Sequence, residues 1–178
     1  MEKFERLERS LVAHGAIIDY YQDTIKVPNG NIVKWDFIGH KGAAAVVPVD
    51  ERGRIIMVSQ YRNALDRYTL EIPAGGLQSA EEPTKDAATR ELAEETGYRS
   101  DHLELLISIR TTVAFCNEKI DIYVADHLVP GNQHLDEDEF VNVKAYTVEE
   151  LTEMIYSGKI QDSKTVAAIM AYKDKFLK

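Results

Sequence analysis

Cysteine is almost absent from this chain: among 178 residues only Cys116 carries a thiol, so no intrachain disulfide can form. The sequence also lacks any apolar run approaching the roughly 20 residues that a membrane-spanning helix requires. Its first 15 residues are charged throughout and contain no apolar core of the kind found in a signal peptide. Together these absences predict a soluble cytoplasmic protein with no membrane partner.

Basic residues are also in short supply. The chain has 21 lysines and arginines against 30 aspartates and glutamates, which gives a formal net charge of −9 and a pI near 5.1. An acidic surface repels phosphate backbones, so we expect no nucleic-acid partner. If the substrate is itself an anion, metal ions or locally placed arginines must offset this field.

Internal repeats, low-complexity tracts and Gly/Ser-rich linkers are absent from the sequence as well. Residues 15–40 read as short strands around a turn at 28–30, where proline, asparagine and glycine follow one another. We therefore expect a small N-terminal antiparallel β subdomain over residues 1–40 and a main domain over 41–178. A sheet of this size rarely stands alone, so it should pack against the main domain or a second subunit.

Hydrophobic patterning predicts mostly strands in the first two thirds of the chain, and helices later. The predicted strands cover residues 42–49, 54–62, 68–75, 103–113, 119–128 and 140–148. The first two flank a turn and read as a buried hairpin. The predicted helices cover 83–96, the residues between Thr147 and Gly158, and 162–177. This mixture predicts an α+β fold rather than a regular βαβ array.

The helix at 83–96 concentrates like charges. On a helical wheel Glu95 lies roughly 40° from Glu91, and Glu94 roughly 60° away on the other side, so all three share a face with small and apolar residues. A solvated acidic helix with an Arg90–Glu94 ion pair is the simpler explanation. However, one arginine cannot neutralise three carboxylates, and like charges on a partly buried face are costly. Clustered hard oxygen ligands instead favour Mg²⁺, with Mn²⁺ as a substitute.

The spacing around this helix resembles the Nudix box. Gly76 is followed after five residues by Glu82, and after seven more by the run R-E-L-A-E-E-T-G-Y at 90–98. The box has the form G, five, E, seven, R-E-aliphatic-x-E-E-x-G-apolar. Only Tyr98 departs from it, since an aliphatic residue is more usual there.

This resemblance implies a Nudix-type α/β/α sandwich around a mixed β-sheet, and a hydrolase of nucleoside diphosphates linked to another moiety. By the same resemblance, Glu91 and Glu95 are metal ligands and Glu94 is a further ligand or an orienting carboxylate. Arg90 would orient the carboxylates, and Glu82 would be structural. The implied chemistry is metal-assisted attack of water on a phosphorus of the pyrophosphate.

Further segments resemble the ADP-ribose and nucleotide-sugar pyrophosphatase branch of that family. They are QYR at 60–62, LEIPAGGL at 70–77 and DEDEFVNV at 136–143. The branch implies a metal-bound backbone carbonyl at Ala74 and a contact between Arg62 and the substrate phosphates. Glu71 matches a glutamate that helps to hold the substrate; an inward carboxylate paired with an arginine explains it equally well.

The acidic loop at 136–139 has two interpretations. By composition it is a solvent-exposed loop, whereas the branch implies a general base at Glu137 and an additional metal ligand at Glu139. The branch also implies that the N-terminal strands complete the site of a homodimer, with an aromatic such as Trp35 stacking on the base. Phe115 is a second aromatic that could pack against the substrate. Val113 stands where ADP-ribose enzymes usually have proline.

We therefore expect a Mg²⁺-dependent, homodimeric enzyme that hydrolyses ADP-ribose to AMP and ribose 5-phosphate. A pyrophosphatase for another nucleotide sugar, such as GDP-mannose or ADP-glucose, is the alternative, because the box reads the pyrophosphate and not the sugar or base. A third possibility is a sensor that binds ADP-ribose without cleaving it. Such regulators usually carry a DNA-binding domain or a degraded box, and this sequence shows neither.

Overall fold

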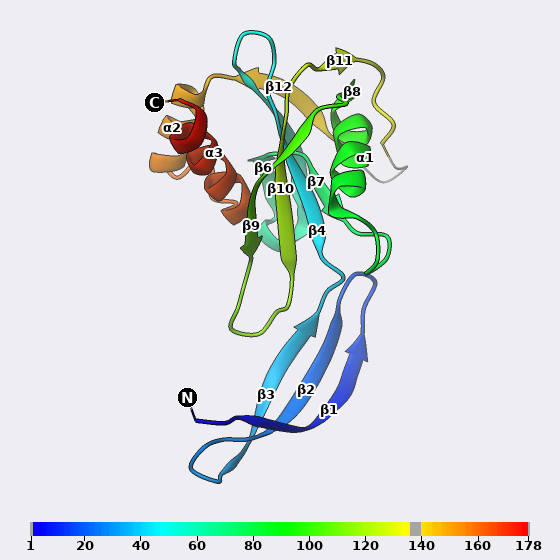
Figure 1. Ribbon diagram of the computed structural model, residues 1–178, viewed down its shortest axis with the longest axis vertical. Coiled ribbons are helices and arrows are strands. Elements are labelled where there is room, and N and C mark those ends of the chain that lie inside the picture. Colours follow the sequence, from blue (N-terminus) through cyan, green and yellow to red (C-terminus); the bar gives the residue numbers. More distant parts are fainter. Residues whose placement is uncertain (1, 136–139, 178) are drawn as a thin grey trace.

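An elongated N-terminal sheet projects from a layered main body in the computed structural model, which describes residues 2–135 and 140–177 (Figure 1). The projecting sheet consists of β1 (Glu5–His14), β2 (Asp19–Lys26) and β3 (Ile32–Gly39), paired antiparallel in that order. The strands around the predicted turn at 28–30 are thus confirmed as β2 and β3. Sequence patterning did not predict β1.

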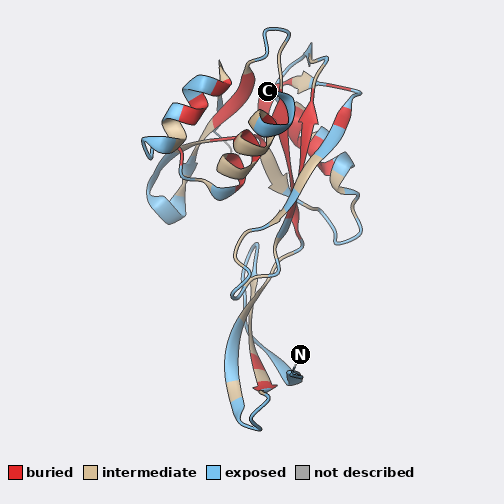
Figure 2. Cartoon of the chain, turned by 60° about the vertical axis from the view of Figure 1, so that its left-hand side comes forward, coloured by how far each residue is buried: buried red, intermediate tan, exposed pale blue. Residues whose placement is uncertain are grey.

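One ion pair supports this thin sheet, which has few buried residues (Figure 2). Arg9 on β1 makes two hydrogen bonds to the buried carboxylate of Asp23 on β2, at 2.7 and 2.6 Å. The same guanidinium lies 3.6 Å from the centre of the Phe37 ring on β3. A bidentate pair and a cation–π contact therefore join all three strands without an apolar core.

Two sheets form the centre of the main body. In the first, the strand order is β7 (Ala74–Gly76), β4 (Ala43–Pro48), β10 (Lys119–Ala125) and β9 (Leu103–Arg110). The second runs in the order β12 (Asn142–Tyr146), β5 (Ile55–Arg62) and β6 (Arg67–Glu71). Only β4 and β10 run parallel, so the first sheet is mixed, as predicted.

Helices cover the sheets on opposite sides (Figure 1). Helix α1 (Thr84–Thr96) closes an apolar cluster centred on Leu92, and α2 (Val148–Tyr156) and α3 (Ser163–Phe176) close a larger one. The short elements η1 (Asn63–Leu65), β8 (Tyr98–Arg99) and β11 (Val129–Pro130) complete the described chain. The predicted α/β/α sandwich is confirmed. Within the described residues, no helix is long and apolar enough to cross a membrane.

The predicted hairpin of 42–49 and 54–62 is wrong. A single bridge between Val49 and Ile55 joins the two strands, which then diverge into different sheets. All six residues of β4 are buried, so both of its edges need partners, and these are β10 and β7. The sequence between the strands indicates a turn but cannot show which strands pair.

The predicted strand 68–75 is also divided between the two sheets. It breaks at Ile72 and Pro73, where β6 ends in one sheet and β7 begins in the other. Proline has no N–H for a sheet ladder, and its carbonyl accepts from the amide of Val46 at 3.0 Å. Because of this crossing, Glu71 and Ala74 belong to different sheets although they are close in sequence.

Helix α1 begins and ends as its sequence predicts, with Pro83 at its start and Gly97 after its last turn. Gly97 has φ of +73°, and an added Cβ would lie 2.9 Å from the amide of Gln133, so glycine is required there. The start of α1 is held by an interaction that patterning did not predict: Thr84 hydrogen bonds to the buried carboxylate of Asp121 on β10, at 2.9 Å. The central strand thereby sets the position of the acidic helix.

Candidate active site

The inward face of α1 carries two of the three helix glutamates. Glu91 and Glu95 are 8% and 3% exposed, alongside the fully buried Ala87, Ala88 and Leu92. The side chain of Glu94 is 39% exposed at the edge of this face. The expected inward orientation is confirmed for Glu91 and Glu95 but not for Glu94, and a helix whose glutamates all face solvent is excluded.

Arg90 binds the carboxylates of the box. Its Nη1 donates to Glu91 at 2.5 Å and to Glu94 at 3.0 Å, and its Nη2 lies 3.5 Å from Glu82. Nη2 also donates to the carbonyl of Gly76 at 3.3 Å. Burial opposes ionisation of Arg90, but the negative charges of Glu91 and Glu94 outweigh it and raise the pKa of the guanidinium. One cation thus orients three carboxylates and ties them to the turn before α1.

Glu95 faces the other end of that turn. Its Oε2 accepts from the amide of Ala74 at 2.9 Å, and its Oε1 accepts from the Gln60 amide at 3.5 Å. At the end of α1, the side chain of Gln133 donates to the Glu95 carbonyl at 2.5 Å. Ala74 and Glu95 are therefore neighbours, as a shared metal site would require. Glu137 and Glu139 lie outside the described residues.

Gly75 allows the backbone to approach Glu91 closely. A Cβ added at Gly75 would overlap the Glu91 carboxylate, whereas one added at Gly76 would meet no described atom within 4 Å. The two adjacent glycines therefore have different roles. The first accommodates a carboxylate of the box, and the second lies beside open space.

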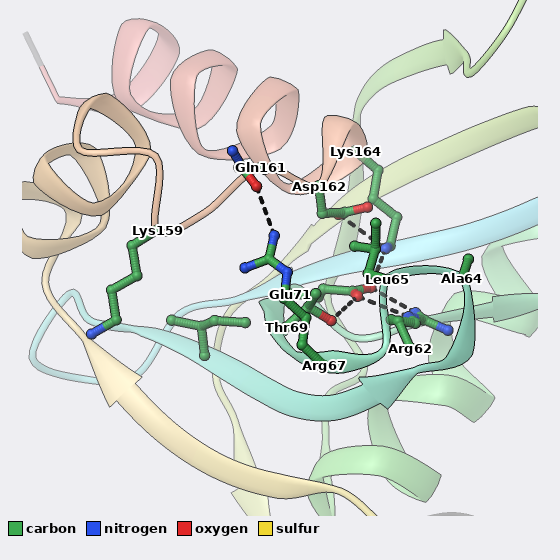
Figure 3. A pocket seen from close by; sticks show the side chains of 11 residues that line it. Arg62, Ala64, Leu65, Arg67, Thr69, Glu71, Lys159, Gln161, Asp162 and Lys164 are labelled. Carbon is green, nitrogen blue, oxygen red and sulfur yellow. Dashed lines mark hydrogen bonds and ion pairs between the residues drawn. The ribbon is translucent and has the colours of Figure 1, made fainter.

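Arg62 and Glu71 form the second charged centre (Figure 3). Nε and Nη2 of Arg62 donate to the two oxygens of Glu71 at 2.8 and 2.6 Å. Glu71 is 2% exposed and also accepts from Thr69 at 2.6 Å and from Lys164 at 2.5 Å. Burial opposes ionisation of Glu71, but the bonds from Arg62 and Lys164 outweigh it and lower its pKa to about 2.

The guanidinium of Arg62 connects the two charged centres. Its hydrogen bonds to Glu71 raise the pKa of Arg62, and the charges of Glu95 and Asp162 raise it further. Its side chain remains 40% exposed, in contrast to that of Glu71. Arg62 therefore holds its position through Glu71 while presenting its other N–H groups to solvent.

A cavity of about 330 Å³ joins these groups. Its lining includes Arg62 and Lys164, the short strand β7 (Ala74–Gly76), and the polar side chains of Thr111 and Glu118. We call Ala74–Gly76 the box turn, because the box begins at Gly76. The structure thus brings the box turn and the phosphate-binding candidate to one concave surface. Lys164 was not predicted from the sequence; the only signal was its place after Asp162, which caps α3 by accepting from the amide of Thr165 at 3.0 Å.

The two aromatic residues that we expected to contact the substrate line a different cavity. Trp35 on β3 and Phe115 in the loop before β10 face a hollow of about 640 Å³, together with Tyr20. Neither Arg62 nor the box turn belongs to its lining. The carbonyl of Phe115 accepts from the amide of Ile38 at 2.7 Å, which fixes this loop to the end of the N-terminal sheet. Within the chain, the aromatic candidates and the box are therefore separate.

A metal site fits these residues by donor chemistry. Two buried carboxylates, Glu91 and Glu95, lie against Gly75 and the amide of Ala74, and hard oxygen ligands of this kind suit Mg²⁺ or Mn²⁺. Within residues 2–135 and 140–177, no three Asp, Glu, His or Cys side chains converge into a complete ligand set. The groups present would hold a hard cation only with additional oxygen ligands.

Replacing Gly75 by alanine should disturb Glu91. Because the new Cβ would overlap the carboxylate, we expect Gly75→Ala to lower the free energy of unfolding by about 1–3 kcal/mol. Gly76→Ala is the matched control and should change it by less than about 1 kcal/mol. Urea unfolding of the three proteins measures both. Equal effects of the two substitutions would contradict the assigned contact.

Glu71 should make stability sensitive to acid. Its pKa is about 2 in the folded protein against an ordinary 4.5, so its stabilising contribution is complete above about pH 5 and is lost as the pH falls toward 2. By pH 3 the loss is about 2 kcal/mol. In urea unfolding at pH 7 and pH 3, Glu71→Gln should therefore lose about 2 kcal/mol less than the wild type. An identical loss in both proteins would refute this linkage.

Comparison with known proteins agrees with the fold and the box. A family model described as the NUDIX domain matches residues 39–169. The ADP-ribose pyrophosphatase of Bacillus subtilis (strain 168) is 38% identical over 165 residues, which is 92% of this chain and 89% of the relative. The methanol dehydrogenase activator of Bacillus methanolicus is 41% identical over 157 residues, 87% of this chain and 84% of the relative.

A solved structure supports the fold independently. The crystal structure of an ADP compounds hydrolase superposes with a TM-score of 0.86, covering 98% of this chain and 94% of its own, at 20% identity. At that identity the likeness concerns the fold. The family model spans most of the chain and includes the whole box, so the resemblance at 76–98 is confirmed. The chain belongs to the NUDIX family of hydrolases.

Proposed function

We propose that the protein is a Mg²⁺-dependent hydrolase that cleaves the pyrophosphate bond of ADP-ribose, with AMP and ribose 5-phosphate as products. The observation that carries this proposal is the cavity that Arg62 and the box turn line together, with the carboxylate of Glu91 against Gly75 of that turn. A pyrophosphate needs cationic contacts on one side and an activated water on the other. The relative from Bacillus subtilis, named ADP-ribose pyrophosphatase, supports the choice of substrate.

The proposed metal ligands are Glu91, Glu94 and Glu95, the carbonyl of Ala74, and Glu139. When bound, the metal supplies polarisation of the phosphate oxygens and a lower pKa of the attacking water. Arg90 would orient the carboxylates, since its Nη1 donates to Glu91 and Glu94. The proposed base that accepts the proton of the water is Glu137.

Arg62 would contact the substrate phosphates through the part of the guanidinium that Glu71 does not occupy. Both oxygens of Glu71 accept bonds from Arg62, and Thr69 and Lys164 occupy their remaining positions. We therefore propose that Glu71 helps to hold the substrate indirectly, by fixing Arg62. This combines the two roles that its sequence context allowed.

Substrate and mechanism can be tested together. With Mg²⁺, ADP-ribose should yield AMP faster than ADP-glucose yields AMP or GDP-mannose yields GMP. Glu95→Gln should lower kcat by at least on the order of 100-fold, because it removes a charged ligand. Glu153→Gln, an exposed position on α2, is the control and should leave kcat unchanged.

The outcomes of this experiment separate the possible functions. A nucleotide sugar that ranks above ADP-ribose would replace the proposed substrate. No hydrolysis of any substrate with Mg²⁺ or Mn²⁺ would contradict the enzymatic function and favour a binding protein. Full activity of Glu95→Gln would contradict the role assigned to the helix.

We further propose a homodimer formed through the N-terminal unit, residues 1–40, with residues 41–178 as the catalytic unit. The supporting observation is that β1 and its neighbours expose large apolar side chains, among them Phe4, Leu11, Val12, Ile32 and Trp35. Exposed apolar surface of this kind is typical of interfaces. A partner's strands could then bring Trp35 to the cavity that lacks an aromatic within one subunit.

The dimer has a direct test. Light scattering should give twice the chain mass of 20.1 kDa. Replacing Leu11 and Val12 by serine should shift the protein toward the monomer, since it removes apolar contact area. A monomeric wild-type protein at micromolar concentration would refute the proposal.

A further inference from the structure

Lys164 is a buried cation to which the reaction described above assigns no part. Its side chain is 10% exposed, and its Nζ donates to Glu71 at 2.5 Å and to Asp162 at 3.0 Å. Lys164 lines the 330 Å³ cavity beside the box turn and also a second cavity of about 370 Å³ (Figure 3). It therefore forms part of the wall between these two cavities, together with Arg62 and Asp162.

Helix stability does not explain a lysine at this position. Lys164 is the second residue of α3, where the positive end of the helix dipole disfavours a cation. Removing an ammonium group from water adds a further cost. Asp162 and Thr165 already hold this end of the helix: Asp162 caps it, and Thr165 accepts from the amide of Ile72 at 3.0 Å. The position of Lys164 is therefore explained by its contact with Glu71.

That contact changes the charge balance around Arg62. Arg62 and Glu71 alone would form a neutral pair, because Glu71 carries one negative charge. Lys164 and Arg62 share the same oxygen of Glu71, Oε2, at 2.5 and 2.6 Å. Asp162 lies on the other side of Lys164: the oxygen that accepts from the amide and hydroxyl of Thr165 also accepts from Nζ of Lys164 at 3.0 Å. Two cations and two carboxylates thus form one connected group with no net formal charge, and without Lys164 the single cation Arg62 would face both Glu71 and Asp162.

We propose that Lys164 is a positioning residue that shares Glu71 with Arg62 and so keeps the exposed edge of Arg62 positively charged toward the diphosphate of the substrate. This rests on the proposed function, in which Arg62 contacts the substrate phosphates. In a protein of net charge −9, such local compensation determines whether an anion can bind beside three glutamates.

The test is binding of ADP, which carries the diphosphate without the sugar, measured by calorimetry in EDTA so that neither metal nor turnover contributes. Lys164→Met should weaken binding about tenfold, because Arg62 is then the single cation beside the two carboxylates of Glu71 and Asp162. Adding Asp162→Asn to Lys164→Met should restore Kd to within about threefold of the wild type, since Arg62 then faces only Glu71 and asparagine still caps α3. Rescue by removal of a second charged residue is not expected of a purely structural lysine.

Lys175→Met is the matched control. Lys175 lies on the same helix and makes an ion pair with Glu104 at 2.6 Å, but it belongs to the lining of neither cavity. Its replacement should leave the Kd of ADP unchanged. Thermal unfolding of each variant separates loss of affinity from loss of structure. If Lys164→Met does not fold, Lys164→Gln provides the same comparison, because it keeps a donor for Glu71 without the charge.

Two results would overturn the proposal: an unchanged Kd for Lys164→Met, or a double variant that binds ADP no better than Lys164→Met. Hydrolysis of ADP-ribose by the wild-type protein is measured separately. Its failure would contradict the proposed function, whereas the ADP series decides the role of Lys164 whichever sugar the enzyme accepts.

Discussion

Repulsion among the carboxylates of α1 is the constraint around which the site is organised. Glu91 and Glu95 are buried on the face that packs against the sheet, where water cannot screen them well. The fold meets this constraint with one guanidinium, Arg90, and with amides of the turn before the helix. Gly75 gives the room that Glu91 needs, and the contact between Thr84 and Asp121 holds the start of α1 on the central strand. These contacts fix the positions of the carboxylates and leave their negative charge in place.

A second group of charges surrounds Arg62. Arg62 is held by Glu71, and Glu71 in turn by Lys164, so that cationic surface persists in a chain of net charge −9. The strands that contact the two groups belong to different sheets, β6 with Glu71 and β7 with Ala74, because the chain crosses between the sheets at Ile72 and Pro73. This crossing places Glu71 under α3 and Ala74 beside Glu95 within three residues. Three residues therefore connect the ionic contacts of Arg62 with the carboxylates of α1.

Much of the fold was predictable where local signals agree. Pro83 and Gly97 bound α1, and Thr147 with Glu150 forms the capping box of α2, as the sequence indicates. The pairing of β4 was not predictable, because its parallel partner β10 lies far along the chain and a turn signal says nothing about distant strands. Strand β1 was missed since its charged residues mask the alternation, although Arg9 proves to be the residue that joins the N-terminal sheet.

The sequence by itself determined the family and the reaction class, because the box residues lie on one helix and one turn, where spacing dictates which side chains share a face. It also indicated Arg62 and Glu71 as candidates, but not that they bind each other. Only the tertiary structure brought Lys164 to Glu71, across 93 residues, and separated Trp35 and Phe115 from the box within one subunit. Helical periodicity is a local property and can be read from the chain. Charge balance in a cavity depends on groups that meet only when distant elements pack together.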